Sequence, residues 1–401
     1  MKSCDNQRAL FLLRTYNDID HIIPIIWKAV TEGWRAYFVF VDKDYSNDYR
    51  IKFITAHGAR SIRSVPIEWY HTKVRRLFKF RIIRRAVDRL VAYFVGLFFL
   101  LRYRINIVAN EWSGPFGREQ AEYYLRAAGL LNLPVYSLPH GFFLWLNPLF
   151  NKEISTVYME SGKFPDFSNR NWFEKYIVQS PEHKAANIEY GMDPNKLVIL
   201  GSARFCKEWS AINYRLLCEG GDFSENNDFT VLFFLPHWDY NVYRDRCISL
   251  LEKISKLNYV RLEIKTHTRG TGALDSTENN IFQSLSNVRI LDDSVHSTLL
   301  IKGADVVVNC GSSVAFEALR QRKLVINPMY LHDNSTFFDY SRAVVDAIDE
   351  KSTLKLIIDA QSGHCISPQQ TDIDEFLHRR VDGNSSGHDV LQSYINLLSG
   401  D

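Results

Sequence analysis

Short apolar runs alternate with amphipathic stretches along most of the chain. The run RALFLL at residues 8–13 predicts a buried strand, 22–31 an amphipathic helix, and 36–41 a second strand. A strand, a helix and a strand in this order predict parallel pairing with a right-handed crossover. Because the alternation continues beyond these elements, we predict an α/β fold built on parallel sheets.

One polar stretch interrupts the alternation. Residues 220–228 begin with GGDFSENN, a composition typical of a linker between two periodic segments. The linker divides the chain into an N-terminal domain at 1–219 and a C-terminal domain at 229–375, followed by a tail or helix at 376–401. Two domains are also the ordinary expectation for 401 residues.

Composition and charge narrow the functional classes. With 46% hydrophobic residues and a net charge of +2, the chain resembles an ordinary globular protein and gives no indication of nucleic-acid binding. The six cysteines lack metal-ligand spacing, so we expect neither a disulfide framework nor structural zinc. No DxD stands at a predicted strand end, and we expect no metal and no cofactor. No signal peptide is apparent, which favours a cytoplasmic location.

The clearest candidate ligand site is a small-residue turn between a strand at 305–309 and a helix that begins at 314. Gly311, Ser312 and Ser313 form this turn, where free backbone N–H groups and serine hydroxyls can bind a phosphate. Glu317 lies one helical turn further on, within reach of ribose hydroxyls. The alternative is a tight turn with serine caps and a surface glutamate.

Two further loops carry candidate anion ligands at strand ends. Lys265 and His267 follow the strand predicted at 259–264, and in a parallel sheet they share an edge with the serine turn. Arg204 follows the strand predicted at 196–200 and can clamp a phosphate or carboxylate by bidentate bonds. Ordinary solvated loop charges are the alternative for Lys265.

Candidates for acid–base or covalent chemistry also follow predicted strands. His140 comes after the strand at 135–138 and can act as a base or a phosphate donor, unless it is a structural histidine. Asp239 follows the strand at 230–235 and is the carboxylate best placed to act as a nucleophile. Glu160 and Glu111, which we place on loops, are its rivals.

Residues 73–104 carry ten Lys or Arg and one acid, Asp88, around the apolar run 90–101. The run of twelve apolar residues is too short to span a bilayer as a helix, which needs about 20. One interpretation is a basic helix followed by a buried helix. The other is peripheral contact with a membrane surface or a lipid diphosphate.

Together, the His140-Gly141 loop, the Gly201–Phe205 loop (GSARF), the Lys265-Thr266-His267 loop and the Gly311-Ser312-Ser313…Glu317 turn resemble those of GT-B glycosyltransferases. Within that fold the chain is most similar to the bacterial retaining β-Kdo transferases that terminate O-antigen chains. It is also similar to the CDP-glycerol glycerophosphotransferases.

The resemblance implies two Rossmann-like domains whose parallel sheets face each other across a cleft. It implies CMP-Kdo as the donor, a lipid-linked glycan acceptor, and work at the inner face of the bacterial inner membrane. His267 corresponds to the histidine of a phosphate-binding His-Pro motif, although Thr268 replaces the proline. The Ser312-Ser313 pair corresponds to a second phosphate- or carboxylate-binding motif. Double displacement through a carboxylate adduct is assigned to Asp239, with Glu160 second and acid–base help from Glu160 or His140.

Two other functions remain open at this point. A CDP-glycerol-dependent glycerophosphotransferase needs no carboxylate nucleophile and uses His140 as its base. A non-catalytic glycan- or lipid-binding module needs neither residue. The final residues, which read as the end of a helix, are compatible with a fragment of a longer polypeptide.

Overall fold

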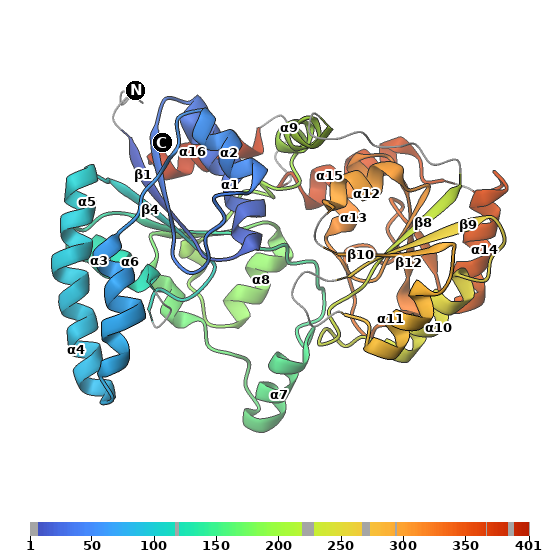
Figure 1. Cartoon of the computed structure of the whole chain (residues 1–401), viewed down its shortest axis with the longest axis horizontal. Helices are drawn as coiled ribbons and strands as arrows, with labels where there is room; N and C mark the ends of the chain where they lie inside the picture. Colours follow the sequence, from blue (N-terminus) through green and yellow to red (C-terminus); the bar gives the residue numbers. More distant parts are fainter. Residues whose placement is uncertain are drawn as a thin grey trace. The chain divides into compact units, whose positions relative to one another are not determined.

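The computed structural model of the chain forms two compact units, each of which has its own sheet (Figure 1). Unit 1 comprises residues 1–142, 166–209 and 385–401, and unit 2 comprises residues 143–165 and 210–384. The residues described here are 7–116, 120–218, 228–266, 273–292, 295–365, 367–383 and 389–400.

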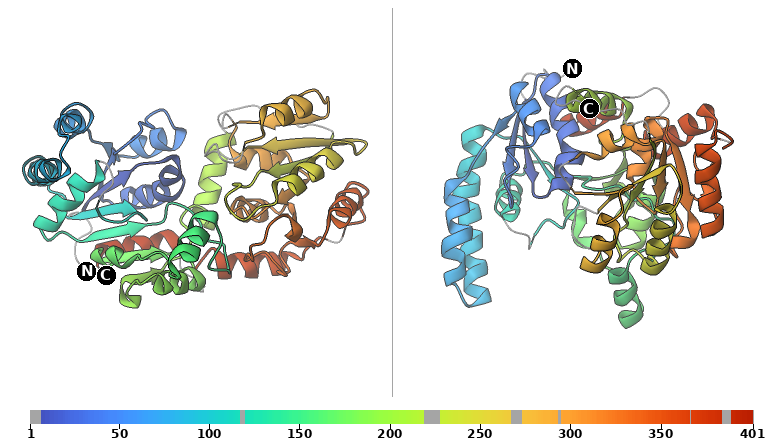
Figure 2. Two further views of the ribbon diagram at one scale, coloured as in Figure 1. Left: turned by 90° about the horizontal axis from the view of Figure 1, so that it is seen from below. Right: turned by 45° about the vertical axis from the view of Figure 1, so that its right-hand side comes forward.

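Unit 1 is built on a seven-stranded parallel sheet with the order β3-β2-β1-β4-β5-β6-β7. The strands are β1 (Arg8–Leu13), β2 (Arg35–Phe40), β3 (Arg60–Ser61), β4 (Ile107–Glu111), β5 (Val135–Leu138), β6 (Lys175–Val178) and β7 (Leu197–Ile199). The helices are α1 (Tyr16–Thr31), α2 (Tyr49–Ala56), α3 (Val65–Trp69), α4 (Arg81–Val91), α5 (Leu97–Tyr103), α6 (Ala121–Leu130), α8 (Pro181–Glu189) and α16 (Val390–Ser399). Helices cover both faces of the sheet (Figure 2), and β1 is accordingly a continuous apolar run after Arg8, as the sequence RALFLL predicts.

Unit 2 is built on a six-stranded parallel sheet with the order β10-β9-β8-β11-β12-β13. The strands are β8 (Phe229–Phe234), β9 (Val260–Lys265), β10 (Val288–Leu291), β11 (Val306–Asn309), β12 (Leu324–Pro328) and β13 (Val345–Ala347). The helices are α7 (Lys152–Ser161), α10 (Arg244–Ile254), α11 (Ser276–Gln283), α12 (Ser297–Gly303), α13 (Val314–Arg320), α14 (Glu350–Gln361) and α15 (Gln370–Arg380). Helix α9 (Lys207–Cys218) contains the point where the chain passes from unit 1 to unit 2. The predicted α/β class with two parallel sheets is confirmed.

Each unit is made of segments that are not contiguous in the sequence. This differs from the predicted division at 1–219, 229–375 and 376–401. Residues 143–165 fold with unit 2, where Asn334 donates to the carbonyl oxygens of Phe150 (2.9 Å) and Tyr240 (2.8 Å). The C-terminal helix α16 folds with unit 1, where the hydroxyl of Tyr394 donates to the carbonyl oxygen of Gly201 (2.9 Å). The predicted linker at 220–228 lies outside the described residues except for Asp228.

Residues 73–104 form the end of the first arm, the turn and the second arm of a helical hairpin in unit 1 that begins at Val65. A single long helical run leads from α4 through a π-helical turn (Ala92–Gly96) into α5. One interpretation of the sequence was a basic helix followed by a buried helix. The second of these helices is only partly buried, since Phe99 and Leu100 are buried whereas Phe98 and Leu101 are exposed. Among the described residues, no helix is both long enough and apolar enough to cross a bilayer.

Candidate functional site

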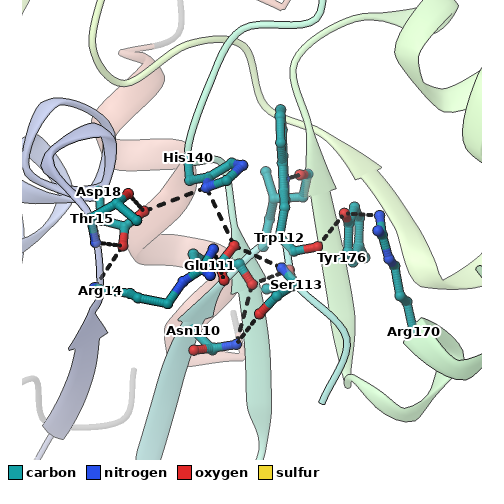
Figure 3. Close-up of polar contacts among 12 residues, drawn as sticks. Arg14, Thr15, Asp18, Asn110, Glu111, Trp112, Ser113, His140, Arg170 and Tyr176 are labelled. Carbon is teal, nitrogen blue, oxygen red and sulfur yellow. Dashed lines mark hydrogen bonds and ion pairs between the residues drawn. The ribbon is translucent and has the colours of Figure 1, made fainter. Parts of the chain in front are cut away.

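Three neighbouring strands of unit 1 bring a histidine, two carboxylates and an arginine together at their carboxyl ends (Figure 3). Arg14 follows β1, Glu111 is the last residue of β4, and His140 follows β5 after a single proline. Asp18 belongs to the first turn of α1, which begins with a capping box at Thr15. Ligand sites of parallel sheets form at this edge.

His140 directs one side of its ring at the two carboxylates. Its buried Nδ1 atom lies 3.4 Å from Oε2 of Glu111 and 3.6 Å from Oδ1 of Asp18. The side chain is 28% exposed, whereas the side chains of Glu111 and Asp18 are 2% and 0% exposed. An imidazole held in this way has its Nδ1 edge on the negative charges, which leaves Nε2 on the opposite edge to exchange a proton with a substrate.

Glu111 and Asp18 are themselves fixed by several donors. The guanidinium of Arg14 pairs with Oε1 of Glu111 at 3.0 Å, and the backbone N–H of Ser113 donates to Oε2 at 2.8 Å. Asp18 accepts backbone hydrogen bonds from Arg14 (2.7 Å) and Thr15 (2.8 Å). Both buried carboxylates therefore have charged or polar partners, as buried ionised groups require.

An aromatic platform supports the loop that follows Glu111. The indole N–H of Trp112 donates to the carbonyl oxygen of Ile177 at 2.7 Å, and its ring meets His140 edge-on at 6.0 Å. The hydroxyl of Tyr176 donates to the carbonyl oxygen of Trp112 at 3.0 Å. His183 packs edge-on against Trp112 at 4.5 Å, and burial, aided by the charge of Arg170, lowers the pKa of His183 to about 3.

Arg204 lies in unit 1, where it pairs with a carboxylate of the chain itself. Its guanidinium is 3.0 Å from Oδ2 of Asp20. The other oxygen of Asp20 accepts from the buried guanidinium of Arg50, which also pairs with Asp48 at 2.8 Å. The proposed clamp on a phosphate or carboxylate therefore requires Arg204 to leave or share its ion pair, and that role stays a prediction.

The serine turn of unit 2 has the predicted position between β11 and α13. Gly311 adopts a positive φ of 62°, and a Cβ there would lie 3.0 Å from the ring of Trp145. The side chain of Asn309 accepts the backbone N–H of Ser312 at 3.0 Å, which fixes the turn. Only glycine tolerates both the backbone conformation and this close approach.

Three other residues of unit 2 were predicted to bind the sugar-nucleotide donor. Two of them contact other residues of the protein, and the third lies outside the described residues. Lys265 is buried, and its ammonium donates to the carbonyl oxygen of Asp292. Glu317 is buried rather than surface-exposed and accepts from the hydroxyl of Thr298 on α12. His267 lies outside the described residues. Ligand roles for these three residues stay predictions.

The two remaining catalytic candidates are open to solvent. Asp239 is 52% exposed and lies 3.6 Å from the ammonium of Lys152 and 3.6 Å from Nδ1 of His237. Glu160 is exposed on helix α7, so our placement of it on a loop was wrong, because Asn151 caps a helix through the N–H of Ile154 (2.8 Å). Among the described residues, no group of three or more His, Cys, Asp or Glu is arranged to hold a metal ion.

Comparison with known proteins identifies the fold. No protein-family model matches the chain, and no curated sequence does. A glycosyltransferase from Rickettsia africae superposes with a TM-score of 0.57 at 14% identity, and the match covers 98% of both chains. The Anabaena protein Alr3699/HepE, solved with UDP and glucose, superposes with a TM-score of 0.59 at 12% identity over 99% of this chain and 100% of that one. The chain has the GT-B fold.

A third similar structure represents another activity. It is the UDP-GlcNAc 2-epimerase of Methanocaldococcus jannaschii with UDP-GlcNAc and UDP, with a TM-score of 0.58 at 13% identity over 98% of this chain and 100% of that chain. Proteins of this fold therefore include both transferases and epimerases. The fold alone does not distinguish the two activities, so the choice between them depends on the residues of the site.

The sequence identified His140 but not the full set of its partners. Asp18 and Arg14 lie in a polar stretch that we did not consider as a site, and Glu111 was only a rival candidate on a presumed loop. A usable signal was present, since Arg14 directly follows the strand predicted at 8–13 and His140 lies two positions after the strand predicted at 135–138. Parallel strands of one sheet end at the same edge, so these two residues could be expected near one another.

Proposed function

We propose that this protein is a glycosyltransferase that uses a sugar-nucleotide donor. The observation that carries the proposal is the buried carboxylate pair behind Nδ1 of His140, at the carboxyl edge of a GT-B sheet. A histidine with this support is suited to general-base catalysis, because the carboxylates stabilise the imidazolium that forms.

We propose the following reaction for this site. An acceptor hydroxyl gives its proton to Nε2 of His140 as its oxygen attacks the anomeric carbon of the donor sugar. The bond from that carbon to the phosphate oxygen breaks, and the electron pair leaves with the nucleotide. Glu111 and Asp18 act as positioning residues, since both are buried on the Nδ1 side of the ring.

For the donor, we propose that unit 2 holds the phosphate at Ser312 and Ser313. The sequence resemblance favours CMP-Kdo, with a lipid-linked bacterial glycan as the acceptor. The alternative donor is a UDP-sugar, which is supported by the UDP and glucose bound in the Anabaena protein.

For retention of the anomeric configuration we propose a carboxylate adduct, with Asp239 as the nucleophile and Glu160 as the second choice. The contacts of Asp239 favour this route less than direct displacement, because pairing with Lys152 and exposure to water both stabilise the resting carboxylate. The stereochemistry of the product separates the two routes.

Epimerisation of a sugar nucleotide is the second candidate, because the structure similar to this chain from Methanocaldococcus is a UDP-GlcNAc 2-epimerase. A base such as His140 can also remove a proton from carbon. An epimerase changes its nucleotide sugar without an acceptor, whereas a transferase consumes the donor only when an acceptor is present.

The deciding experiment measures donor consumption with and without glycan acceptor, using CMP-Kdo and a set of UDP-sugars. We expect acceptor-dependent release of nucleotide and a decrease in kcat of about 10² to 10⁴-fold in His140→Ala. Asp239→Asn is the companion variant, since full activity in it excludes a covalent adduct on Asp239. Epimerised donor in the absence of acceptor, or unchanged turnover in His140→Ala, would overturn the proposal.

A further inference from the structure

The helical hairpin of unit 1, residues 65–104, is packed against the unit on one side only. Its first arm runs from α3 into the turn Arg75–Leu77, and its second arm runs from α4 to α5 (Figures 1 and 2). Gly96 lies on the packed side of the hairpin, where it approaches α6 so closely that a Cβ would lie 2.7 Å from the carbonyl oxygen of Tyr123. The hairpin is therefore a firmly attached element with a second, uncovered side.

That uncovered side is apolar. At the turn between the arms, Leu77, Phe80 and Ile82 are 75%, 72% and 83% exposed. Further exposed apolar side chains follow along the second arm at Ile83, Leu90, Phe94, Phe98 and Leu101. Their separations of seven, four, four and three residues place them along one side of a helix. Exposed apolar surface of this kind marks an interaction site.

The segment that carries these apolar side chains is positively charged and offers no exposed carboxylate within 73–104. Asp88, the one acid of that segment, is 7% exposed and accepts from Tyr70 (2.9 Å), Tyr123 (3.2 Å) and Arg75 (3.1 Å). The exposed cations of the segment are Lys73, Arg76, Lys79, Arg81, Arg85, Arg89, Arg102 and Arg104. Three of them alternate with the apolar side chains of the turn, at positions 76, 79 and 81.

We infer that the hairpin docks the protein on the surface of an anionic lipid membrane. Apolar side chains that protrude between cations match the acyl boundary and the phosphate groups of such a surface. A second copy of the same surface would bring like charges together, which opposes self-association. The inference does not depend on the proposed function, because it involves neither His140 nor the nucleotide loops.

Co-sedimentation with vesicles of phosphatidylcholine, with and without phosphatidylglycerol, tests the inference. The wild-type chain is expected to sediment with the anionic vesicles, to bind neutral vesicles weakly, and to be released by salt. The triple variant Arg76→Gln, Lys79→Gln, Arg81→Gln should bind about a hundredfold more weakly, since each cation near a membrane contributes about a fivefold factor. The triple variant Leu77→Ser, Phe80→Ser, Ile82→Ser should lose the binding that remains at high salt.

The matched control replaces equally exposed apolar residues elsewhere, Tyr259→Ser and Ile348→Ser, and should bind as the wild type does. All substituted side chains are exposed, so we expect every variant to fold. A melting temperature equal to that of the wild type checks this for each variant. Equal sedimentation of the wild type and both triple variants would overturn the inference. A concentration-dependent dimer that the serine variant abolishes, without any vesicle binding, would also overturn it and assign the surface to a second copy.

Discussion

At the scale of single residues, the charge of Glu111 is the feature that prepares His140 for proton transfer. We expect Glu111→Gln to lower kcat about ten- to a hundredfold with little change in KM, because it removes a negative charge 3.4 Å from Nδ1 of His140, and each tenfold corresponds to about 1.4 kcal/mol. Steady-state kinetics measure this, with Glu189→Gln, an exposed carboxylate of α8, as the control. A rise in KM at constant kcat would instead assign Glu111 to substrate binding.

His183 gives a pH dependence of stability. Burial holds its folded-state pKa at about 3, below the ordinary value of 6.5, so the stability that it contributes is full above pH 6.5 and is lost as the pH falls toward 3. Between pH 7.5 and pH 5.5 the loss amounts to about 1.4 kcal/mol, since only the unfolded chain binds the proton.

The measurement compares the unfolding free energy at the two pH values in the wild type and in His183→Gln. Glutamine has a similar length and does not titrate, so the variant should be less sensitive to pH even where it is less stable overall. Equal losses in both proteins would show that other groups cause the acid destabilisation.

At the scale of elements, helix α16 completes unit 1 although it comes last in the sequence. Leu391 and Tyr394 of this helix are fully buried, and Asp389 at its start pairs with Lys28 of α1 at 3.1 Å. Leu391→Ala should destabilise the protein by about 2–5 kcal/mol, through lost burial and a residual cavity. Thermal unfolding checks this against Asn396→Ala on the exposed side of the same helix, and equal melting temperatures would show that α16 does not stabilise the unit.

The bounds of a helix or strand could be predicted where its own sequence shows that it is buried. Strand β1 has the predicted bounds because a strand covered on both faces is a continuous apolar run, whatever its neighbours are. Helix α7 escaped prediction because its composition is mixed and it buries little more than Ile154. The docking of α16 depends on Gly201, 193 positions earlier in the chain, and no local pattern records such a pairing.

At the scale of the whole molecule, the chain crosses between its two units more often than a single linker suggests. Asn334 holds residues 143–165 to unit 2 through the carbonyl oxygens of Phe150 and Tyr240, which are 184 and 94 positions away. The sequence therefore predicts two parallel sheets, which depend on local periodicity. It does not predict which sheet receives each connecting segment, because those contacts are long-range.

Nucleotide preference is also a property of the whole folded chain, because a ligand that binds only the folded state stabilises it by mass action. At a concentration of 100 times Kd the gain is about 2.7 kcal/mol, which corresponds to roughly 5–10 °C in the melting temperature of a domain of this size. We expect CMP to give the larger shift when CMP and UDP are compared at equal concentrations. Ser312→Ala with Ser313→Ala should remove the shift, while Ser362→Ala, an exposed serine of unit 2, should keep it. A larger shift with UDP would replace CMP-Kdo by a UDP-sugar as the donor, and no shift with either nucleotide would favour a non-catalytic binding module.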